Sequence, residues 1–450
     1  MPGRSRRPST DGAASPWTDR RTRNRRSVHA VAESRRVQAI VHPPVVVGLV
    51  GPPRRPGPIG GQVLEGEAEG PQTGEVDVIG QDYGARRLIG CRHPGPGLVT
   101  GHTGFKGSWL ALWLHHLGAE VAGYSDHVPG PPSVFELLGL ETRIDHRLGD
   151  IRDRSHLAEV LDEVRPDMVF HLAAQALVLQ SHVDPVGTFE TNTMGMVNLL
   201  ECIRERPWIE VAVLVTSDKA YRNEEWPWGY RETDRLGGHD PYSGSKSCAE
   251  LVAHSYHHSF LRDSPTRSAT ARAGNVIGGG DWASDRIVPD CIRAWSSLEA
   301  VSVRRPGSTR PWQHVLEPLS GYLWLGSNLL DGQEDLDGEA FNFGPDDQQD
   351  MTVADLLQAM AERWPGAGWQ INEEESDTNR EATLLRLSCE KALRHLGWRA
   401  VMQFPHTVAL TIDWYRAWQD SEVDLHDFTI GQIEQYTELA KCAGVAWSNQ

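Results

Sequence analysis

The sequence lacks the features that mark a membrane protein, a disulfide-bonded protein or a general nucleic-acid binder. Its best apolar run covers only Val45–Val50, whereas a membrane-spanning helix needs about 18 to 20 apolar residues. The six cysteines have no metal-ligand spacing, and no apolar signal segment begins the chain. The net charge of −17 is opposite to the basic footprint of nucleic-acid binders. We therefore expect a cytoplasmic protein that binds no nucleic acid, membrane or metal.

Lysine is also scarce. The chain has 44 basic residues, and only five of them are lysines. Because arginine serves wherever a general cation is needed, each lysine suggests a specific chemical role. A lysine, unlike an arginine, can lose its proton at accessible pH. Three of the five, Lys106, Lys219 and Lys246, fall in the motifs described below.

Residues 1–96 differ in composition from the rest of the chain. They hold 15 Arg, no Lys and nine acidic residues, which gives +6 and leaves −23 for the remainder. Runs such as PPRRPGPIGG sustain neither helical nor strand periodicity. We expect either a disordered extension or an artefact of an upstream start or shifted reading frame. A basic transit peptide or nucleic-acid tail is the less favoured alternative, and we assign this segment no function.

From Leu98 onward, short apolar segments alternate with helical patterns. Apolar segments that predict strands cover 119–124, 167–174 and 211–217. Helical spacing covers 108–117, 154–164 and 185–204. This alternation predicts an α/β fold with a doubly wound parallel sheet over 97–275. Helices separated by loops predict a smaller C-terminal portion over 276–420 and a tail over 421–450.

A glycine-rich loop lies between the first predicted strand and the first helix. The segment TGHTGFKG places Gly101, Gly104 and Gly107 three residues apart. Glycine permits a tight turn and close approach of the backbone to a pyrophosphate, and the helix N-terminus supplies free N–H groups. We predict a dinucleotide site of the Rossmann type that also includes Phe105 and Lys106. Prolines just upstream leave a first strand that is either short or not the natural one.

Further residues fit the other parts of a dinucleotide. An acid about 20 residues after the loop would bind the adenosine ribose, and Asp126 fits, although Ser125 is an alternative. No arginine stands beside it to accept a 2′-phosphate, which favours NAD over NADP. Asp150 and Ile151 are candidates for the adenine contact, although Asp150 could instead cap a helix. The small segment Leu172–Ala173–Ala174 follows a predicted buried strand and would face the cofactor.

A serine, an aspartate, a tyrosine and two lysines form the candidate catalytic group. Tyr242 and Lys246 are four residues apart, so they share one face of a helix. Lys246 would lower the pKa of Tyr242, which could then act as a base on an alcohol. Ser217 would orient the same hydroxyl, and Asp218 and Lys219 follow it directly. The alternative for Asp218 and Lys219 is a surface ion pair.

Residues 98–418 resemble the extended short-chain dehydrogenase/reductase superfamily, and within it the CDP-glucose 4,6-dehydratases. The resemblance rests on four blocks: GHTGFKGSWLALWL, TSDKAYRNEEWPWGYRETDRLGGHDPYSGSK, RAGNVIGGGDWASDRIVPDCIRAW and RPWQHVLEPLSGY. Dehydratases for dTDP-glucose usually have Thr-Asp-Glu where this chain has Ser217-Asp218-Lys219. The resemblance does not extend to residues 1–96.

The resemblance implies a lyase that converts CDP-D-glucose to CDP-4-dehydro-6-deoxy-D-glucose and water with tightly bound NAD. It implies that Tyr242 removes the 4-hydroxyl proton, that Asp218 protonates the departing 6-oxygen and that Lys219 acts at C5. It also implies a homo-oligomer. Residues expected to contact the sugar nucleotide are Asn275, Arg286, Arg310 and His314, although each arginine could instead be a solvated surface charge.

Two alternative functions remain at this stage. One is another sugar-nucleotide enzyme on the same scaffold, either a dehydratase for a different nucleotide or a 4-epimerase. The other is a non-catalytic NAD-binding protein. Retention of Asp218 and Lys219 argues against an epimerase, and retention of Tyr242 and Lys246 argues against a non-catalytic protein.

Overall fold

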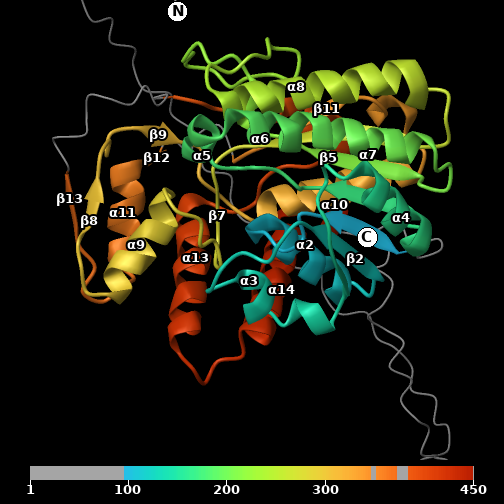
Figure 1. Cartoon of the computed structure of the whole chain (residues 1–450). Coiled ribbons are helices and arrows are strands. Elements are labelled where there is room, and N and C mark those ends of the chain that lie inside the picture. Colours follow the sequence, from blue (N-terminus) through green and yellow to red (C-terminus); the bar gives the residue numbers. More distant parts are fainter. Residues whose placement is uncertain (1–95, 346–350, 372–383, 449–450) are drawn as a thin grey trace, which may run out of the picture. The chain divides into compact units, whose positions relative to one another are not determined.

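The computed structural model describes residues 96–345, 351–371 and 384–448 (Figure 1). The chain divides into two units, 1–75 and 76–450, and every described residue belongs to the second. The predicted extension over residues 1–96 therefore lies outside the described residues except for Pro96. No helix in the described ranges is long and apolar enough to cross a membrane.

A seven-stranded sheet forms the centre of the structure, with strand order β11-β6-β5-β4-β1-β2-β3. Every neighbouring pair is parallel. The strands are β1 (Gly97–Thr100), β2 (Val121–Ser125), β3 (Asp145–Leu148), β4 (Met168–His171), β5 (Val211–Val215), β6 (Arg267–Ala273) and β11 (Ala340–Phe343). The chain runs outward from β1 to β3 and then returns to β4 on the other side of β1. The predicted doubly wound parallel sheet is confirmed, and the reversal beside β1 is where ligands bind in such sheets.

Helices cover both faces of this sheet (Figure 1). On one face, Leu98 packs in a core with α4 (Arg154–Val164), α7 (Gly195–Arg204) and α8 (Pro241–Tyr256). On the other, Val99 packs in the larger core with α2 (Phe105–His116) and α10 (Leu316–Leu330). Adjacent residues of β1 thus point to opposite faces, as strand geometry requires. Short helical segments join these elements: α3 (Val134–Leu137), α5 (Val178–Val183), α6 (Pro185–Phe189) and a π-helical turn at Glu190–Met194.

The first strand is short, as its upstream prolines predict. Only Gly97–Thr100 form β1, yet all four residues pair with both β2 and β4. Leu98 and Val99 are completely buried. A four-residue strand is sufficient here because it has a neighbour on each side and a helix layer on each face.

The C-terminal portion contributes both to the main sheet and to smaller layers around it. Its strand β11 lies beside β6 at the edge of the main sheet. Three two-stranded sheets pair β7 (Val276–Ile277) with β10 (Gln313–His314), β9 (Thr309–Arg310) with β12 (Met351–Thr352), and β8 (Val301–Val303) with β13 (Trp369–Ile371). Besides α10, its helices are α9 (Ile287–Ser296), α11 (Val353–Ala361), α12 (Glu390–Leu396), α13 (Phe404–Gln419) and α14 (Leu425–Ala443).

Much of the segment that the sequence assigned to a tail is a packed helix. Residues 425–443 form α14, whose Ile433 and Tyr436 are buried in the larger core. The ring of Tyr436 meets the edge of Trp113 on α2 at 5.9 Å between centroids. The last long helix therefore packs beside the first helix of the sheet.

A buried carboxyl group connects α10 with the C-terminal helices. Glu317 Oε1 accepts hydrogen bonds from the backbone N–H groups of Val401 and Met402 at 2.9 and 2.6 Å. Its Oε2 accepts one from the Tyr436 hydroxyl at 2.9 Å. Burial raises the pKa of Glu317 to about 7. The group is therefore protonated more readily in the folded chain than in the unfolded one.

We expect Glu317 to make stability depend on pH. Because its pKa is higher in the folded state, its contribution is complete below the unfolded pKa of about 4.3 and is lost as pH rises through 7. Glu317→Gln, which cannot ionise, should abolish that part of the decline, about 3 kcal/mol. Urea unfolding at pH 5 and pH 8 measures the decline in the free energy of unfolding, and Glu159→Gln, at an exposed position, is the control. Equal declines in wild type and Glu317→Gln would contradict the assignment.

Candidate functional site

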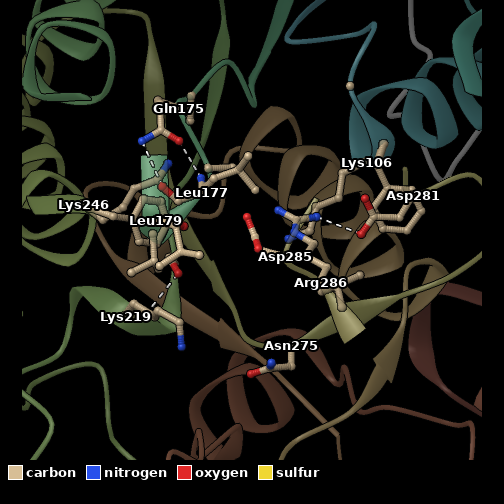
Figure 2. Close-up of a pocket in the computed structure, with 18 of the residues that line it drawn as sticks. Lys106, Gln175, Leu177, Leu179, Lys219, Lys246, Asn275, Asp281, Asp285 and Arg286 are labelled. Atoms are coloured by element: carbon tan, nitrogen blue, oxygen red, sulfur yellow. Dashed lines mark hydrogen bonds and ion pairs between the residues drawn. The ribbon is translucent and has the colours of Figure 1, made fainter. Parts of the chain in front are cut away.

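A cavity of about 1230 Å³ opens where the carboxyl ends of the central strands meet (Figure 2). Its walls come from the loops after β1, β2, β4 and β5, the start of α8, the segment after β6 and the start of α9. All but one of the site residues predicted from the sequence line it: Gly101, Gly104, Phe105, Lys106, Gly107, Asp126, Asp150, Ile151, Leu172, Ala173, Ala174, Ser217, Asp218, Lys219, Tyr242, Lys246, Asn275, Arg286 and Arg310.

Backbone crowding explains two of the loop glycines. Gly101 has φ +76°, and a Cβ there would lie 2.7 Å from the backbone nitrogen of Ala173. A Cβ on Gly107 would lie 2.0 Å from the carbonyl oxygen of Gly101. The N-terminus of α2 has no side-chain cap, so its first N–H groups are available to a ligand. The loop therefore fits a phosphate group.

The structure separates the two candidates for the ribose contact. The Ser125 hydroxyl is already engaged, because it hydrogen-bonds His102 Nδ1 at 2.9 Å and accepts from the backbone N–H of Thr103 at 3.3 Å. The Asp126 carboxylate is exposed beside His127 at 2.8 Å. Ser125 thus fixes the glycine loop, while Asp126 remains accessible at the cavity. Burial and the nearby His146 lower the pKa of His102 to about 3, which keeps this ring neutral.

Asp150 and Ile151 occupy the end of the cavity beyond β3. The Asp150 carboxylate accepts from the backbone N–H of Arg152 at 2.8 Å. It does not cap α4, because Asp153 does so through a 3.1 Å bond from the N–H of His156. The helix-capping aspartate of the segment 150–153 is thus Asp153, and Asp150 remains at the cavity.

Tyr242 and Lys246 project from consecutive turns of α8 and are both buried. Asp240 caps this helix by accepting the N–H of Ser243 at 2.9 Å. Burial raises the pKa of Tyr242, and a hydrogen bond with Ser217 opposes that rise. Burial lowers the pKa of Lys246 to about 8. The predicted net lowering of the tyrosine pKa by Lys246 is therefore not seen, because removing a phenolate from water dominates.

Asp218 is buried with one carboxylate oxygen unused. Its Oδ1 accepts the Ser217 hydroxyl at 3.1 Å, whereas Oδ2 has no hydrogen-bond partner among the described residues. A Cβ on Gly274 would lie 3.0 Å from that Oδ2, so the glycine leaves room beside it. Only 2% of Asp218 is exposed, which excludes a surface ion pair. Lys219 follows it, half-buried, at the cavity wall.

The opposite wall carries further positive charge. Arg286 pairs with the buried Asp281 at 2.9 Å. Burial, followed by the charge of Arg286, lowers the pKa of Lys106 to about 8. Figure 2 shows Lys106, Asp281 and Arg286 together, across the cavity from Lys219 and Lys246. Two cations facing one cavity suit a diphosphate.

The structure corrects the prediction for His314. This side chain does not line the cavity, is completely buried and meets the edge of Trp109 at 5.8 Å. The ring instead packs against Trp109 of the larger core, and its Nδ1 accepts the backbone N–H of Leu316 at 3.4 Å. Its backbone neighbour Gln313 instead supports the site by donating its N–H to the carbonyl of Asn275 at 3.1 Å. Arg310, also predicted here, is buried at the cavity wall rather than solvated.

Two residues behind the catalytic group were not predicted from the sequence. Glu250 and Arg272 form an ion pair of 2.7 Å with about 4% exposure each. The spacing of Glu250 from Lys246, one further helical turn, is the signal that could have found it. Trp226 and Trp228 follow Lys219 in the second of the four blocks that carry the resemblance. Neither lines the cavity, and the two rings pack on each other at 5.6 Å.

Comparisons with known proteins agree with this site. A family profile described as GDP-mannose 4,6 dehydratase matches residues 98–269. The CDP-glucose 4,6-dehydratase of Salmonella typhimurium is 45% identical over 326 residues, which covers 71% of this chain and 90% of the relative. The dTDP-glucose 4,6-dehydratase of Streptomyces antibioticus is 30% identical, covering 71% and 92%. The solved UDP-glucose 4-epimerase of Thermus thermophilus, in complex with NAD, matches with a TM-score of 0.59 and 26% identity, covering 71% of this chain and 99% of its own.

We expect the glycine loop to tolerate no side chain at its third glycine. Gly107→Ala should lower the free energy of unfolding by about 2 to 3 kcal/mol, because its methyl group meets backbone atoms that cannot rotate away. The control is Gly431→Ala on α14, where a Cβ meets nothing within 4 Å, and which should raise stability by about 0.5 to 1 kcal/mol. Denaturant titration of both variants compares them. Equal effects in the two helices would contradict the crowding argument.

Proposed function

Because the chain belongs to the CDP-glucose 4,6-dehydratase family, we propose that it removes water from CDP-D-glucose to give CDP-4-dehydro-6-deoxy-D-glucose. The observation that carries the proposal is the buried, partly unpartnered carboxylate of Asp218 beside Tyr242 and Lys246. An acid at that place is needed for elimination and not for simple alcohol oxidation. The cavity also holds a dinucleotide loop, so both halves of the reaction share one space.

The residues present fit NAD. The crowded backbone at Gly101 and Gly107 and the uncapped α2 would bind its diphosphate. Asp126 would bind the adenosine ribose, and Lys246 the other ribose. When bound, NAD supplies a hydride acceptor for C4 and a hydride donor for C6. The small residues Ala173 and Ala174 leave room for the cofactor between the loop and β4.

The side chains of this chain move the protons. Tyr242 takes the proton of the 4-hydroxyl, and Ser217 orients that hydroxyl through its contact with the tyrosine. Oxidation at C4 acidifies the C5 proton, which Lys219 removes. The 6-oxygen departs as water after receiving a proton from Asp218, whose Oδ2 has no hydrogen-bond partner among the described residues. Lys106 and Arg286 hold the diphosphate of the substrate.

Asp218 and Lys219 favour a dehydratase over an epimerase on the same scaffold. An epimerase needs only the transient oxidation at the sugar ring, for which Tyr242 and Lys246 suffice. A buried carboxylate without a complete set of partners is costly, so its presence supports a role in elimination.

We expect the purified protein to convert CDP-glucose to a product lighter by one water, detectable by mass spectrometry. dTDP-glucose, UDP-glucose and GDP-mannose are the comparison substrates. Asp218→Asn should reduce water loss by about 100- to 1,000-fold, because the amide cannot supply the proton. Tyr242→Phe should abolish it, since oxidation at C4 then lacks its base. Water loss from another nucleotide sugar alone would overturn the substrate, and full activity of Asp218→Asn would overturn the assigned acid.

We also propose that the protein acts as a homo-oligomer in the cytoplasm. Large apolar side chains are exposed along α5, α6 and α8: Val183 at 78%, Val186 at 66% and Leu251 at 57%. Such a patch favours association with a second copy. The buried thiols of Cys202 and Cys291 fit a reducing compartment.

We expect Val186→Glu to shift the protein toward monomers, because it places a charge among these exposed apolar side chains. Analytical ultracentrifugation of wild type and variant measures the change. Leu298→Glu, at an apolar position elsewhere on the chain that is 85% exposed, is the control and should leave the assembly unchanged. A wild-type protein that sediments as a monomer would overturn the proposal.

A further inference from the structure

A buried ion pair lies directly behind the catalytic group and outside the roles assigned above. Glu250 is on α8, one turn beyond Lys246 and two turns beyond Tyr242. Arg272 is on β6, two residues before Gly274 at the cavity wall. Their contact is two-pronged, with Nε to Oε1 at 2.7 Å and Nη2 to Oε2 at 2.8 Å.

The pair joins three chain segments: α8, β6 and the segment that follows β5. The Glu250 carboxylate accepts hydrogen bonds from Thr216, which directly precedes Ser217, and from Thr270 at 2.9 Å. Arg272 Nη1 donates to the Tyr221 hydroxyl at 2.7 Å and to the carbonyl of Glu232 at 3.1 Å. Glu250 thus holds the residue that precedes Ser217, Asp218 and Lys219, and Arg272 holds residues that follow them.

Stability alone does not account for such a pair. Removing two charges from water is costly, and apolar replacements of buried ion pairs are often as stable or more stable. Here the two charged side chains hydrogen-bond Thr216 and Tyr221, which lie on either side of the predicted catalytic residues 217–219. Each remaining donor and acceptor is directed to the segment 216–232 or to strand β6.

We propose that Glu250 and Arg272 are a positioning pair, which sets the charge of Lys246 and holds the Ser217–Lys219 segment against α8. This inference rests on the proposed function. Neither residue touches the cavity, so both would act through Lys246 and Thr216 rather than on substrate.

The charges around Lys246 show why Glu250 matters. Burial lowers the pKa of Lys246 and the Glu250 carboxylate raises it, with the balance at about 8. His171, on the neighbouring strand β4, has its pKa lowered to about 3 by burial and by Lys246, so it stays neutral. Lys106 contributes a repelling positive charge from the far wall. Around Glu250 itself the polar groups are Thr216, Thr270 and Arg272, and Glu250 is the carboxylate that keeps Lys246 charged near neutral pH.

The test removes both charges together, so that no lone charge stays buried. In Glu250→Gln/Arg272→Met, the amide oxygen can still accept from one threonine hydroxyl and the amide N–H can donate to the other, and the methionine fills the space of the arginine stem. We expect kcat to fall by about 10- to 100-fold with KM within about threefold, because the reacting groups are displaced while the substrate is still bound. The basic limb of the kcat–pH profile should move down by about one unit.

A second readout needs no turnover. With only five lysines in the chain, the protein labelled with [ε-13C]lysine gives few resonances, and Lys246→Arg assigns the one of interest. The pKa of Lys246 should drop by about one unit in the double variant. Glu317→Gln is the matched control, a buried carboxylate outside the cavity, and should leave the Lys246 titration and the kcat–pH profile unchanged.

A third variant separates charge from geometry and applies even if the double variant does not fold. Arg272→Lys keeps the charges balanced but cannot make the two-pronged contact, so kcat should fall while Lys246 titrates as in wild type. Wild-type kcat in Arg272→Lys overturns the positioning of the segment. An unchanged Lys246 titration in the folded double variant overturns the control of charge. If the Lys246 titration shifts in the double variant but the wild-type protein removes no water from CDP-glucose, the proposed function is refuted and the positioning pair is not.

Discussion

Close contact between backbones at the glycine loop is the constraint on which the rest of the site depends. The turn after β1 passes so near to the segment after β4 that Gly101 has no room for a side chain, and the start of α2 returns onto the same turn at Gly107. This contact aligns the open end of α2 with the reversal of strand order beside β1. The cavity opens beside that point.

Charge in the cavity is controlled mainly by burial. Lys106 and Lys246 both have a pKa near 8 because they are removed from water, while burial raises the pKa of Tyr242. Both shifts favour the neutral form of the group. Charged neighbours such as Glu250 and Arg286 then decide which groups keep a charge. An enzyme that transfers several protons in one site needs groups whose protonation is so finely balanced.

The sequence predicts those parts of the fold and site that depend on local patterns. The glycine loop, the Tyr242–Lys246 spacing and the helix over 154–164 each follow from residues within one or two turns, and the structure has them where predicted. Features that depend on distant residues were not predicted. The pairing of Glu250 with Arg272 joins a helix to a strand, and β11 joins the main sheet from the C-terminal portion. His314 lies on a strand of only two residues, which is too short for its sequence pattern to show which way the side chain points.

The packing of α14 beside α2 has a consequence for the order in which the protein is made. The helix that carries the phosphate loop is among the first described elements to leave the ribosome, while the helix that completes its apolar surface is the last long one. Trp113 meets Tyr436 and Trp447 only after both have been synthesised. The helix that begins at the cofactor loop therefore keeps part of its apolar surface uncovered until the last long helix has been synthesised.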